Sequence, residues 1–368
     1  MQLSNDSGVV TMSLSRTRRK EIIDALINEL GIDLYKQSFS VERFARDHGV
    51  SRQSIYRYLD TLVNENVLLK QLTTNISVSK TEYRMSDTWY RLRYPIAGLA
   101  EDVVWKQDIF PALQDVPETA LRVCNYAFCE MLNNVIDHSE GTRVKIDLYV
   151  NAFRSSFLIR DDGVGIFTKI ATAMNLAEKR FAILELAKGK FTTAPESHTG
   201  EGIFFSAKAA DVFEIHNDSI VFSTSVFDKS EHKHFYIDDT LTLGSTTIRF
   251  DVFHQHVTPL SELFSLYAND PDDYGFTKTI VPVKLLEHGD DNPLLVSRSQ
   301  AKRLLVRFDR FEHIELDFAG IDEIGQGFAD EIFRVYHNQH PGITIVPVNC
   351  NSQVEKMIKH VTSNFNLL

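Results

Sequence analysis

A carboxylate and an amide lie four residues apart near the end of a predicted helix, at Glu130 and Asn134. Residues at this spacing share one face of a helix. A carboxylate there can act as a general base toward water, and an amide oxygen is a suitable ligand for Mg²⁺. Because such pairs are common on solvated helix faces, this one predicts metal-assisted chemistry only together with further elements downstream.

Two glycine-rich segments supply those elements. Asp161-Asp162-Gly163-Val164-Gly165 comes directly after an apolar stretch, residues 155–160, and His198-Thr199-Gly200-Glu201-Gly202 precedes a second predicted helix. Glycine lets the backbone pass close to a ligand. N–H groups at the start of a helix bind phosphate, helped by the helix dipole. The pattern therefore indicates a site for a phosphorylated ligand.

The order of these motifs resembles that of the Bergerat-fold (GHKL) ATPases. Residues 130–138 are similar to the N box of that family, residues 161–166 to its D-x-G-x-G box and residues 198–206 to its T-G-x-G box. Gly244-Ser245-Thr246-Thr247 resembles the closing G-T element. Four elements in this order make the resemblance specific, and it implies an α/β sandwich over residues 118–255 that binds ATP with Mg²⁺.

The resemblance also implies individual roles. Glu130 is the expected catalytic base, Asn134 the Mg²⁺ ligand, and Asp161 the acceptor of the adenine amino group. A hydroxyl from Ser245, Thr246 or Thr247 would support Asp161, and the sequence leaves the choice among the three open. The remaining expected nucleotide contacts are Gly163, Gly165, Lys190, Thr199, Gly200, Gly202 and Thr246.

The segment between the second and third motifs, residues 167–197, is where the ATP lid is expected. It contains a helix-like stretch, residues 178–188, and a Gly189-Lys190 turn. Lys190 could reach the γ-phosphate from this lid, although a lysine there is more often only solvated. Periodicity predicts the elements that would position the site, namely a helix over residues 118–138 and strands over residues 143–150, 155–160, 212–217, 219–226, 234–237 and 246–253.

The N-terminal segment has the spacing of a helix-turn-helix. Helices are predicted over residues 16–30, with Gly31 as a stop, and over residues 41–47 and 52–64, with Ser51 as a cap. Two β-rich stretches, residues 65–71 and 77–85, are separated by a predicted turn at residues 73–75. Residues 16–90 thus resemble winged helix-turn-helix DNA-binding domains, and the expected contacts with double-stranded DNA are Ser51, Arg52, Gln53, Ser54, Tyr56 and Arg57.

The charge distribution agrees with this assignment. The chain of 368 residues has a net charge of −11, which argues against a protein that coats nucleic acid over its whole surface. Residues 1–93 carry 14 Lys+Arg and 11 Asp+Glu, a net charge of +3, so the remainder carries −14. A winged helix used only for protein contacts is the alternative interpretation. Reading a palindromic site would require dimerisation.

The C-terminal segment, residues 276–368, alternates predicted strands and helices, which is typical of a small, largely parallel sheet. Residues 315–329 resemble the strand, loop and helix start of STAS-like domains. The phosphorylatable serine that such domains carry in this loop has no counterpart here, because Gln326 and Gly327 stand near its position. We expect a lobe that binds a protein partner or associates with itself.

The whole is predicted to be a multidomain chain with a disordered tail (residues 1–15), a connector (91–117) and a linker (256–275). No stretch is apolar enough to cross a membrane, no secretion signal is apparent, and Cys124, Cys129 and Cys350 lack the spacing of a metal or redox site, so we expect a cytoplasmic protein. Residues 90–117 contain no histidine, which argues against a histidine autokinase.

These inferences predict an ATP-dependent regulatory switch, a DNA-binding transcriptional regulator whose ATP-binding domain hydrolyses slowly or only senses MgATP. Two alternatives remain. One is a Ser/Thr protein kinase of the anti-sigma-factor type that acts on a separate protein. The other is an ATP sensor without turnover.

Overall fold

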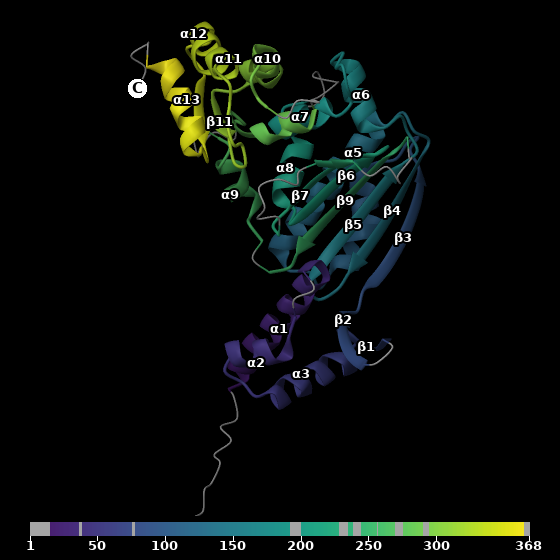
Figure 1. The fold of residues 1–368 in the computed structure, drawn as a ribbon. Helices are drawn as coiled ribbons and strands as arrows, with labels where there is room; N and C mark the ends of the chain where they lie inside the picture. The colour runs from purple at the N-terminus through teal and green to yellow at the C-terminus, as the bar shows by residue number, and fades with distance from the viewer. Residues whose placement is uncertain are drawn as a thin grey trace, which may run out of the picture. The chain divides into compact units, whose positions relative to one another are not determined.

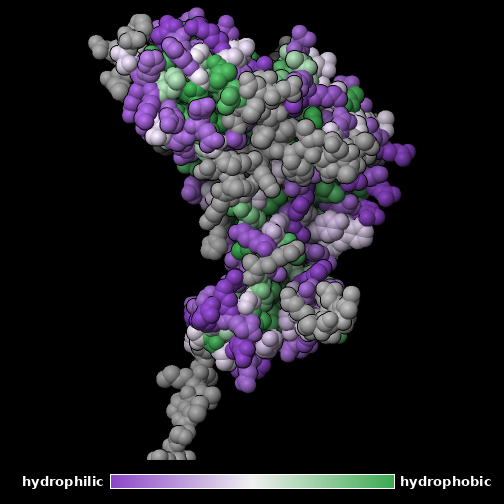
Figure 2. All heavy atoms as spheres, viewed as in Figure 1, coloured by the Kyte–Doolittle hydropathy of each residue, from purple (hydrophilic) through white to green (hydrophobic). Residues whose placement is uncertain are grey.

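The computed structural model describes residues 15–36, 39–75, 78–191, 200–227, 235–237, 244–255, 257–268, 275–289 and 294–363. The chain divides into two compact units, the first containing residues 1–88 and 151–154 and the second residues 89–150 and 155–368. Figure 2 shows hydrophilic residues over most of the visible surface of the described part. None of the helices in the described ranges is long and apolar enough to cross a membrane.

Three helices form most of the first unit: α1 (Arg16–Lys36), α2 (Val41–Asp47) and α3 (Arg52–Asn64) (Figure 1). Ser40 and Ser51 cap α2 and α3, since each side chain accepts a hydrogen bond from a backbone N–H in the first turn. Of the predicted tail, residues 1–14 lie outside the described residues. The apolar faces of the helices meet in a core of Ile22, Leu26, Leu30, Phe44, Ile55, Leu59 and Leu62.

The prediction that Gly31 ends the first helix is wrong, because α1 continues for five more residues to Lys36. Gly31 is buried within the helix. A Cβ atom at this position would lie 2.1 Å from Cγ of Phe153, which belongs to the same unit. The glycine is therefore required by the close approach of an aromatic ring and not by the end of the helix.

A hairpin of β1 (Leu68–Asn75) and β2 (Val78–Met85) completes the first unit. The strands pair antiparallel, with Leu68 opposite Met85, and both of these side chains are buried. Residues 73–75, where we predicted the turn, belong to β1, and residues 76–77 lie outside the described part. The two β-rich stretches do pair antiparallel, as the predicted two-stranded hairpin requires.

A seven-stranded sheet with the order β3-β4-β5-β9-β6-β7-β8 dominates the second unit (Figure 1). Asp161 is the last residue of β5 and Thr246 the first of β9, so the two motifs meet where neighbouring strands end and begin. The strands are β3 (Thr88–Pro95), β4 (Arg143–Val150), β5 (Arg154–Asp161), β6 (Val212–Asn217), β7 (Ile220–Ser225), β8 (Phe235–Ile237) and β9 (Thr246–Phe253).

Two segments that we interpreted as connections are structured. Residues 91–117 are not a simple connector, because β3 is an edge strand of the large sheet and three short helices follow it, α4 (Glu101–Val104), η1 (Trp105–Ile109) and η2 (Phe110–Leu113). Within residues 256–275, the predicted linker, α9 (Leu260–Ser265) packs against α8 (Gly202–Ala209). Buried apolar side chains such as Leu113 in η2 and Leu263 in α9 explain why these helices pack against the rest of the unit.

Helix α5 (Glu118–His138) packs against α8 and β9, and the core between them is rich in phenylalanine. Phe128, Phe157 and Phe250 are fully buried, and the rings of Phe157 and Phe250 stack with their centroids 4.6 Å apart. Burial of each such ring contributes about 1.5–3 kcal/mol. Two further helices, α6 (Ile166–Ala173) and α7 (Phe181–Lys188), lie between the second and third motifs.

The C-terminal part of this unit contains a three-stranded parallel sheet of β10 (Lys278–Pro282), β11 (His313–Asp317) and β12 (Thr344–Val348), in that order. This confirms the predicted small parallel sheet. Ser297 caps the helix before β11 with a capping box. The helical segments are η3 (Val283–Gly289), α10 (Arg298–Leu305), η4 (Phe308–Arg310), α11 (Gln326–Asp330), η5 (Glu331–Tyr336), α12 (His337–Gln339) and α13 (Ser352–Thr362).

One buried carboxyl of the large sheet makes stability depend on pH. Burial and the nearby Asp251 raise the pKa of Asp211 to about 6, although the Phe253 N–H donates to its Oδ2 at 2.7 Å. Because this pKa is higher in the folded chain than in the unfolded chain, protonation of Asp211 stabilises the fold. The stabilisation is fully present below the unfolded-state pKa and is lost as the pH rises through about 6.

We therefore expect Asp211→Asn, which keeps an oxygen acceptor for Phe253, to raise the free energy of unfolding at pH 8 by about 1–3 kcal/mol. At pH 5, which lies between the unfolded-state pKa and the folded-state pKa of about 6, the gain should be about half as large. Thermal unfolding of both proteins at the two pH values measures the difference. An equal effect at pH 5 and pH 8 would show that ionisation of Asp211 is not its cause.

Candidate nucleotide site

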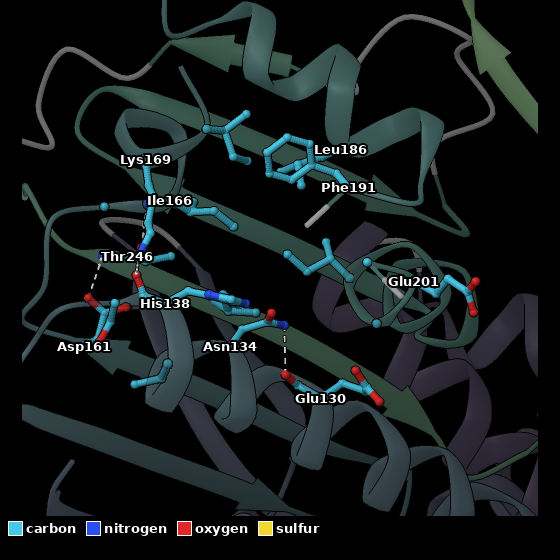
Figure 3. A pocket seen from close by; sticks show the side chains of 18 residues that line it. Glu130, Asn134, His138, Asp161, Ile166, Lys169, Leu186, Phe191, Glu201 and Thr246 are labelled. Carbon is cyan, nitrogen blue, oxygen red and sulfur yellow. Dashed lines mark hydrogen bonds between the residues drawn. The ribbon is translucent and has the colours of Figure 1, made fainter. Parts of the chain in front are cut away.

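The two polar residues of α5 lie one turn apart and line the same cavity (Figure 3). Nδ2 of Asn134 donates to the backbone oxygen of Glu130 at 2.8 Å. This bond orients the amide, and the atom suited to a metal ion is the amide oxygen. Both side chains are partly exposed, so each is accessible to a small ligand from solvent.

The carboxylate of Asp161 is almost completely buried, with 5% of the residue exposed. The N–H groups of Gly163 and Thr246 both donate to Oδ1, at 2.8 and 3.3 Å. Burial raises the pKa of this carboxyl, and the two backbone donors partly offset the rise. A carboxylate can accept about four hydrogen bonds, so the group keeps capacity to accept from a ligand in the cavity that it lines.

Glycine is required on both sides of the turn after Asp161. A Cβ at Gly163 would lie 2.0 Å from the backbone oxygen of Ser139, and Gly165 has a φ of +85°. Gly165 lines the cavity, whereas Gly163 does not and lies close to the backbone of Ser139. Because the N–H of Gly163 donates to Oδ1 of Asp161, Gly163 helps to orient that carboxylate.

The third motif approaches the cavity from the start of α8. Gly200 and Gly202 both line it, and Gly200 has a φ of +74°. A Cβ at Gly202 would lie 1.9 Å from Oε2 of Glu130, so glycine allows α8 to begin next to that carboxylate. Thr199, the other predicted contact of this motif, lies outside the described residues.

Thr246 is the hydroxyl residue of the fourth motif that reaches the site. Its N–H donates to Asp161, and its Oγ1 accepts from the N–H of Ile166 at 3.0 Å. Thr247 instead accepts from the side chain of Arg160 at 3.2 Å. Of the three candidates that the sequence left open, Thr246 is therefore the one that ties the Asp161 carboxylate to the following turn.

Together these segments enclose a cavity of about 270 Å³. Its polar residues come from all four motifs, and its apolar walls come mainly from α5, α6 and the end of α7. Figure 3 shows Asp161 and Thr246 on one side of the cavity and Glu130 on the other, with Asn134 between them. The apolar lining residues are Val135, Ile166, Ile170, Leu186, Phe191, Ile203 and Ile248.

Sequence reasoning missed several lining residues, and Lys169 is the main one. Its ammonium donates to the backbone oxygen of His138 at 2.7 Å and to Oε1 of Glu140 at 2.9 Å, which joins α6 to the end of α5. The signal was available in the helical spacing of Ile166 and Ile170 around this lysine. We treated residues 167–197 as a lid and predicted a helix only over residues 178–188, so α6 was not predicted.

In this structure the side chain of Lys190 points away from the position that the predicted γ-phosphate contact requires. Lys190 does not line the cavity. Its ammonium donates to the backbone oxygen of Arg310 at 3.0 Å and lies over the rings of Phe276 and Phe311. The physical reason is a left-handed backbone, with a φ of 50°, that follows Gly189 and turns the lysine toward the C-terminal sheet domain.

The predicted DNA-contacting residues occupy the start of α3. Arg52, Gln53, Tyr56 and Arg57 are exposed. Ser51 is also exposed, and its hydroxyl caps α3 by accepting from the N–H of Ser54 and contacts the Ser54 hydroxyl. Arg52 forms an exposed ion pair with Glu42, 3.4 Å apart, that contributes little stability. Arg57 is tethered to Ser54 Oγ at 3.1 Å.

No cluster of three or more His, Cys, Asp or Glu side chains in the described ranges could hold a metal ion. The residues present still fit a Mg²⁺ ion bound in part by a nucleotide, since such ions commonly take only one or two protein ligands and share phosphate oxygens. Asn134, beside Glu130 in the cavity lining, would supply the oxygen ligand in such an arrangement.

Comparison with known proteins identifies one region. Residues 300–355 match the family model described as a STAS-like domain of unknown function (DUF4325). The match confirms the predicted STAS-like character of the C-terminal domain and covers most of its helices and two of its three strands. No curated protein matches the chain.

Proposed function

We propose that this protein is an ATP-dependent regulatory switch, in which residues 118–255 are a Bergerat-type domain that binds MgATP in the cavity described above. The observation that carries the proposal is that one cavity is lined by residues from four motifs that are far apart in the sequence. Along the chain, these motifs follow one another in the order that the family resemblance implies. A second support is that the cavity is lined by two carboxylates with different exposure, since Asp161 is buried and Glu130 is half-buried.

In this proposal Asp161 accepts a hydrogen bond from the adenine amino group, and the apolar walls cover the ring. The N–H groups at the start of α8 bind phosphate oxygens. Asn134 ligates Mg²⁺, which neutralises charge on the phosphates. The Glu130 carboxylate would orient the attacking water and accept a proton from it, a role that its partial exposure allows.

The test is calorimetric titration with a non-hydrolysable ATP analogue and Mg²⁺, followed by measurement of phosphate release from ATP. Binding with slow release supports a hydrolysing switch. Binding without release supports a sensor, and phosphate transfer from ATP to a separate protein supports the kinase alternative. If the analogue does not bind, the proposed nucleotide site is wrong.

We further propose that residues 16–90 are a winged helix-turn-helix that binds double-stranded DNA, which makes transcriptional regulation the simplest use of the switch. The support is that α3 begins with exposed Arg52, Gln53, Tyr56 and Arg57 after a helix and a capped turn, and that a hairpin follows it. Arginine and glutamine read base edges, and such a helix start is suited to the major groove.

We expect Arg52→Ala and Arg57→Ala each to weaken duplex binding about tenfold and to reduce its salt dependence, because each removes a cation from the proposed groove-facing surface. Fluorescence anisotropy over a range of salt concentrations measures both effects. Arg122→Ala is the matched control, since Arg122 is equally exposed but lies in the second unit, on α5. Equal binding by all three variants would exclude α3 as the recognition helix.

A further inference from the structure

The segment of residues 181–191 contacts two parts of the second unit. Leu186 and Phe191 line the nucleotide cavity. Other residues of the same segment contact residues 306–311, which connect α10 to β11 in the C-terminal domain. The segment thus lies between the cavity and the C-terminal domain. That domain itself contributes no residue to the cavity lining.

Arg307 makes the central contact. Its Nη1 donates to Oε2 of Glu185 at 2.9 Å and to the Glu185 backbone oxygen at 3.2 Å, and its Nη2 donates to the backbone oxygen of Gly189 at 2.6 Å. The guanidinium carbon lies 5.2 Å from the centre of the Phe191 ring. A planar guanidinium fork of this kind restrains both position and orientation.

Buried charge strengthens the contact. Lys188 is fully buried, and its ammonium donates to Oε1 of Glu185 at 2.7 Å and to the backbone oxygen of Val306 at 3.0 Å. Glu185 is also buried, and it therefore shares its charge between Lys188 and Arg307. Removal of Arg307 would leave Glu185 paired with Lys188 alone, so α7 would lose its charge-assisted contact with residue 307.

A second pair of contacts lies beside the first. Lys190 donates to the backbone oxygen of Arg310, and Arg310 donates to the backbone oxygen of Lys190 at 2.9 Å. Gly189, Lys190 and Arg307 all have left-handed backbone conformations. Residues other than glycine keep this conformation only where their surroundings require it.

Phe191 also contacts the third motif, whose N–H groups are proposed to bind phosphate. The N–H of Phe191 donates to the backbone oxygen of Gly200 at 3.1 Å. A Cβ at Gly200 would lie 2.5 Å from the Phe191 backbone, so the two segments are in close contact. Gly202, two residues later, begins α8 at the cavity.

We propose that residues 306–311 form a clasp that holds residues 181–191 in place, with Arg307 as the residue that positions Phe191 against the nucleotide. This inference rests on the proposed binding of MgATP. The affinity for MgATP then depends on how the C-terminal domain is docked. By thermodynamic linkage, MgATP in turn tightens the clasp, so a protein partner that competes for residues 306–311 would weaken nucleotide binding.

Hydrogen–deuterium exchange of the full chain tests the clasp without nucleotide, and calorimetry with the non-hydrolysable analogue tests its effect on the site. Arg307→Ala should speed exchange in residues 181–191 at least tenfold and weaken analogue binding about tenfold, and Arg307→Lys should restore part of both. Arg310→Ala, at an exposed position, should have a smaller effect in the same direction and covers the case in which Arg307→Ala does not fold. Arg334→Ala is the control, since Arg334 pairs with Asp330 elsewhere in the same domain.

In the wild-type chain, the analogue should slow exchange in residues 306–311. Unchanged exchange in residues 181–191 of Arg307→Ala and Arg310→Ala would overturn the clasp, and so would faster exchange with unchanged affinity. If the wild-type chain does not bind the analogue, the proposed function fails. In that case the exchange comparison still decides whether residues 306–311 hold the segment.

Discussion

Asp161→Asn should weaken the binding of adenine nucleotide at least 100-fold while leaving the domain folded. The N–H groups of Gly163 and Thr246 both donate to one oxygen of this carboxylate. An asparagine would keep its oxygen toward these donors, which directs its NH₂ group to the second position. The adenine amino group would then meet a donor in place of an acceptor, and an unsatisfied buried pair costs about 1–3 kcal/mol or more.

Calorimetry with the non-hydrolysable ATP analogue and Mg²⁺ measures this loss. Asp162→Asn is the matched control, because the adjacent carboxylate accepts from the N–H groups of Thr142 and Arg143 and does not line the cavity. Circular dichroism and the thermal unfolding midpoint establish that each variant is folded. Normal binding by Asp161→Asn would mean that the adenine position has been assigned wrongly.

Most strands and helices could be predicted because their signals, alternating burial and helix caps, lie within short stretches of sequence. In β4 the buried positions Val144, Ile146 and Leu148 alternate with more exposed ones, so the strand has the two-residue period of a half-buried sheet. A side-chain cap at Ser51 likewise marks the start of α3 within the sequence. Gly31 misled us because its reason, the ring of Phe153, is distant in sequence.

The site was predicted in part for the same reason. Glu130, Asn134 and Asp161 could be found because each belongs to a short motif, and all three line the cavity. The choice of Thr246 depends on the pairing of its strand with the end of β5, which three consecutive hydroxyl residues cannot reveal. The direction of Lys190 could not be predicted from the sequence, because it depends on a contact with Arg310 in the C-terminal domain.

Glu130→Gln should lower the rate of phosphate release from ATP by about 10²–10⁴-fold and leave the affinity for the analogue unchanged. Glutamine has nearly the same shape as glutamate, so the contact with Gly202 at the start of α8 is preserved. It cannot take a proton from water at neutral pH. The change therefore removes the proposed base without removing the packing around it.

Glu201→Gln is the matched control for this effect, because Glu201 also lines the cavity and is partly exposed. In Figure 3 its carboxylate points away from Asn134, where Mg²⁺ is proposed to bind. Phosphate release by this variant should stay within a factor of a few of wild type. Equal release by wild type and Glu130→Gln would exclude Glu130 as the base. If wild type binds ATP but releases no phosphate, the half-buried carboxylate serves a nucleotide sensor, and the state of the switch is then determined by nucleotide binding and dissociation.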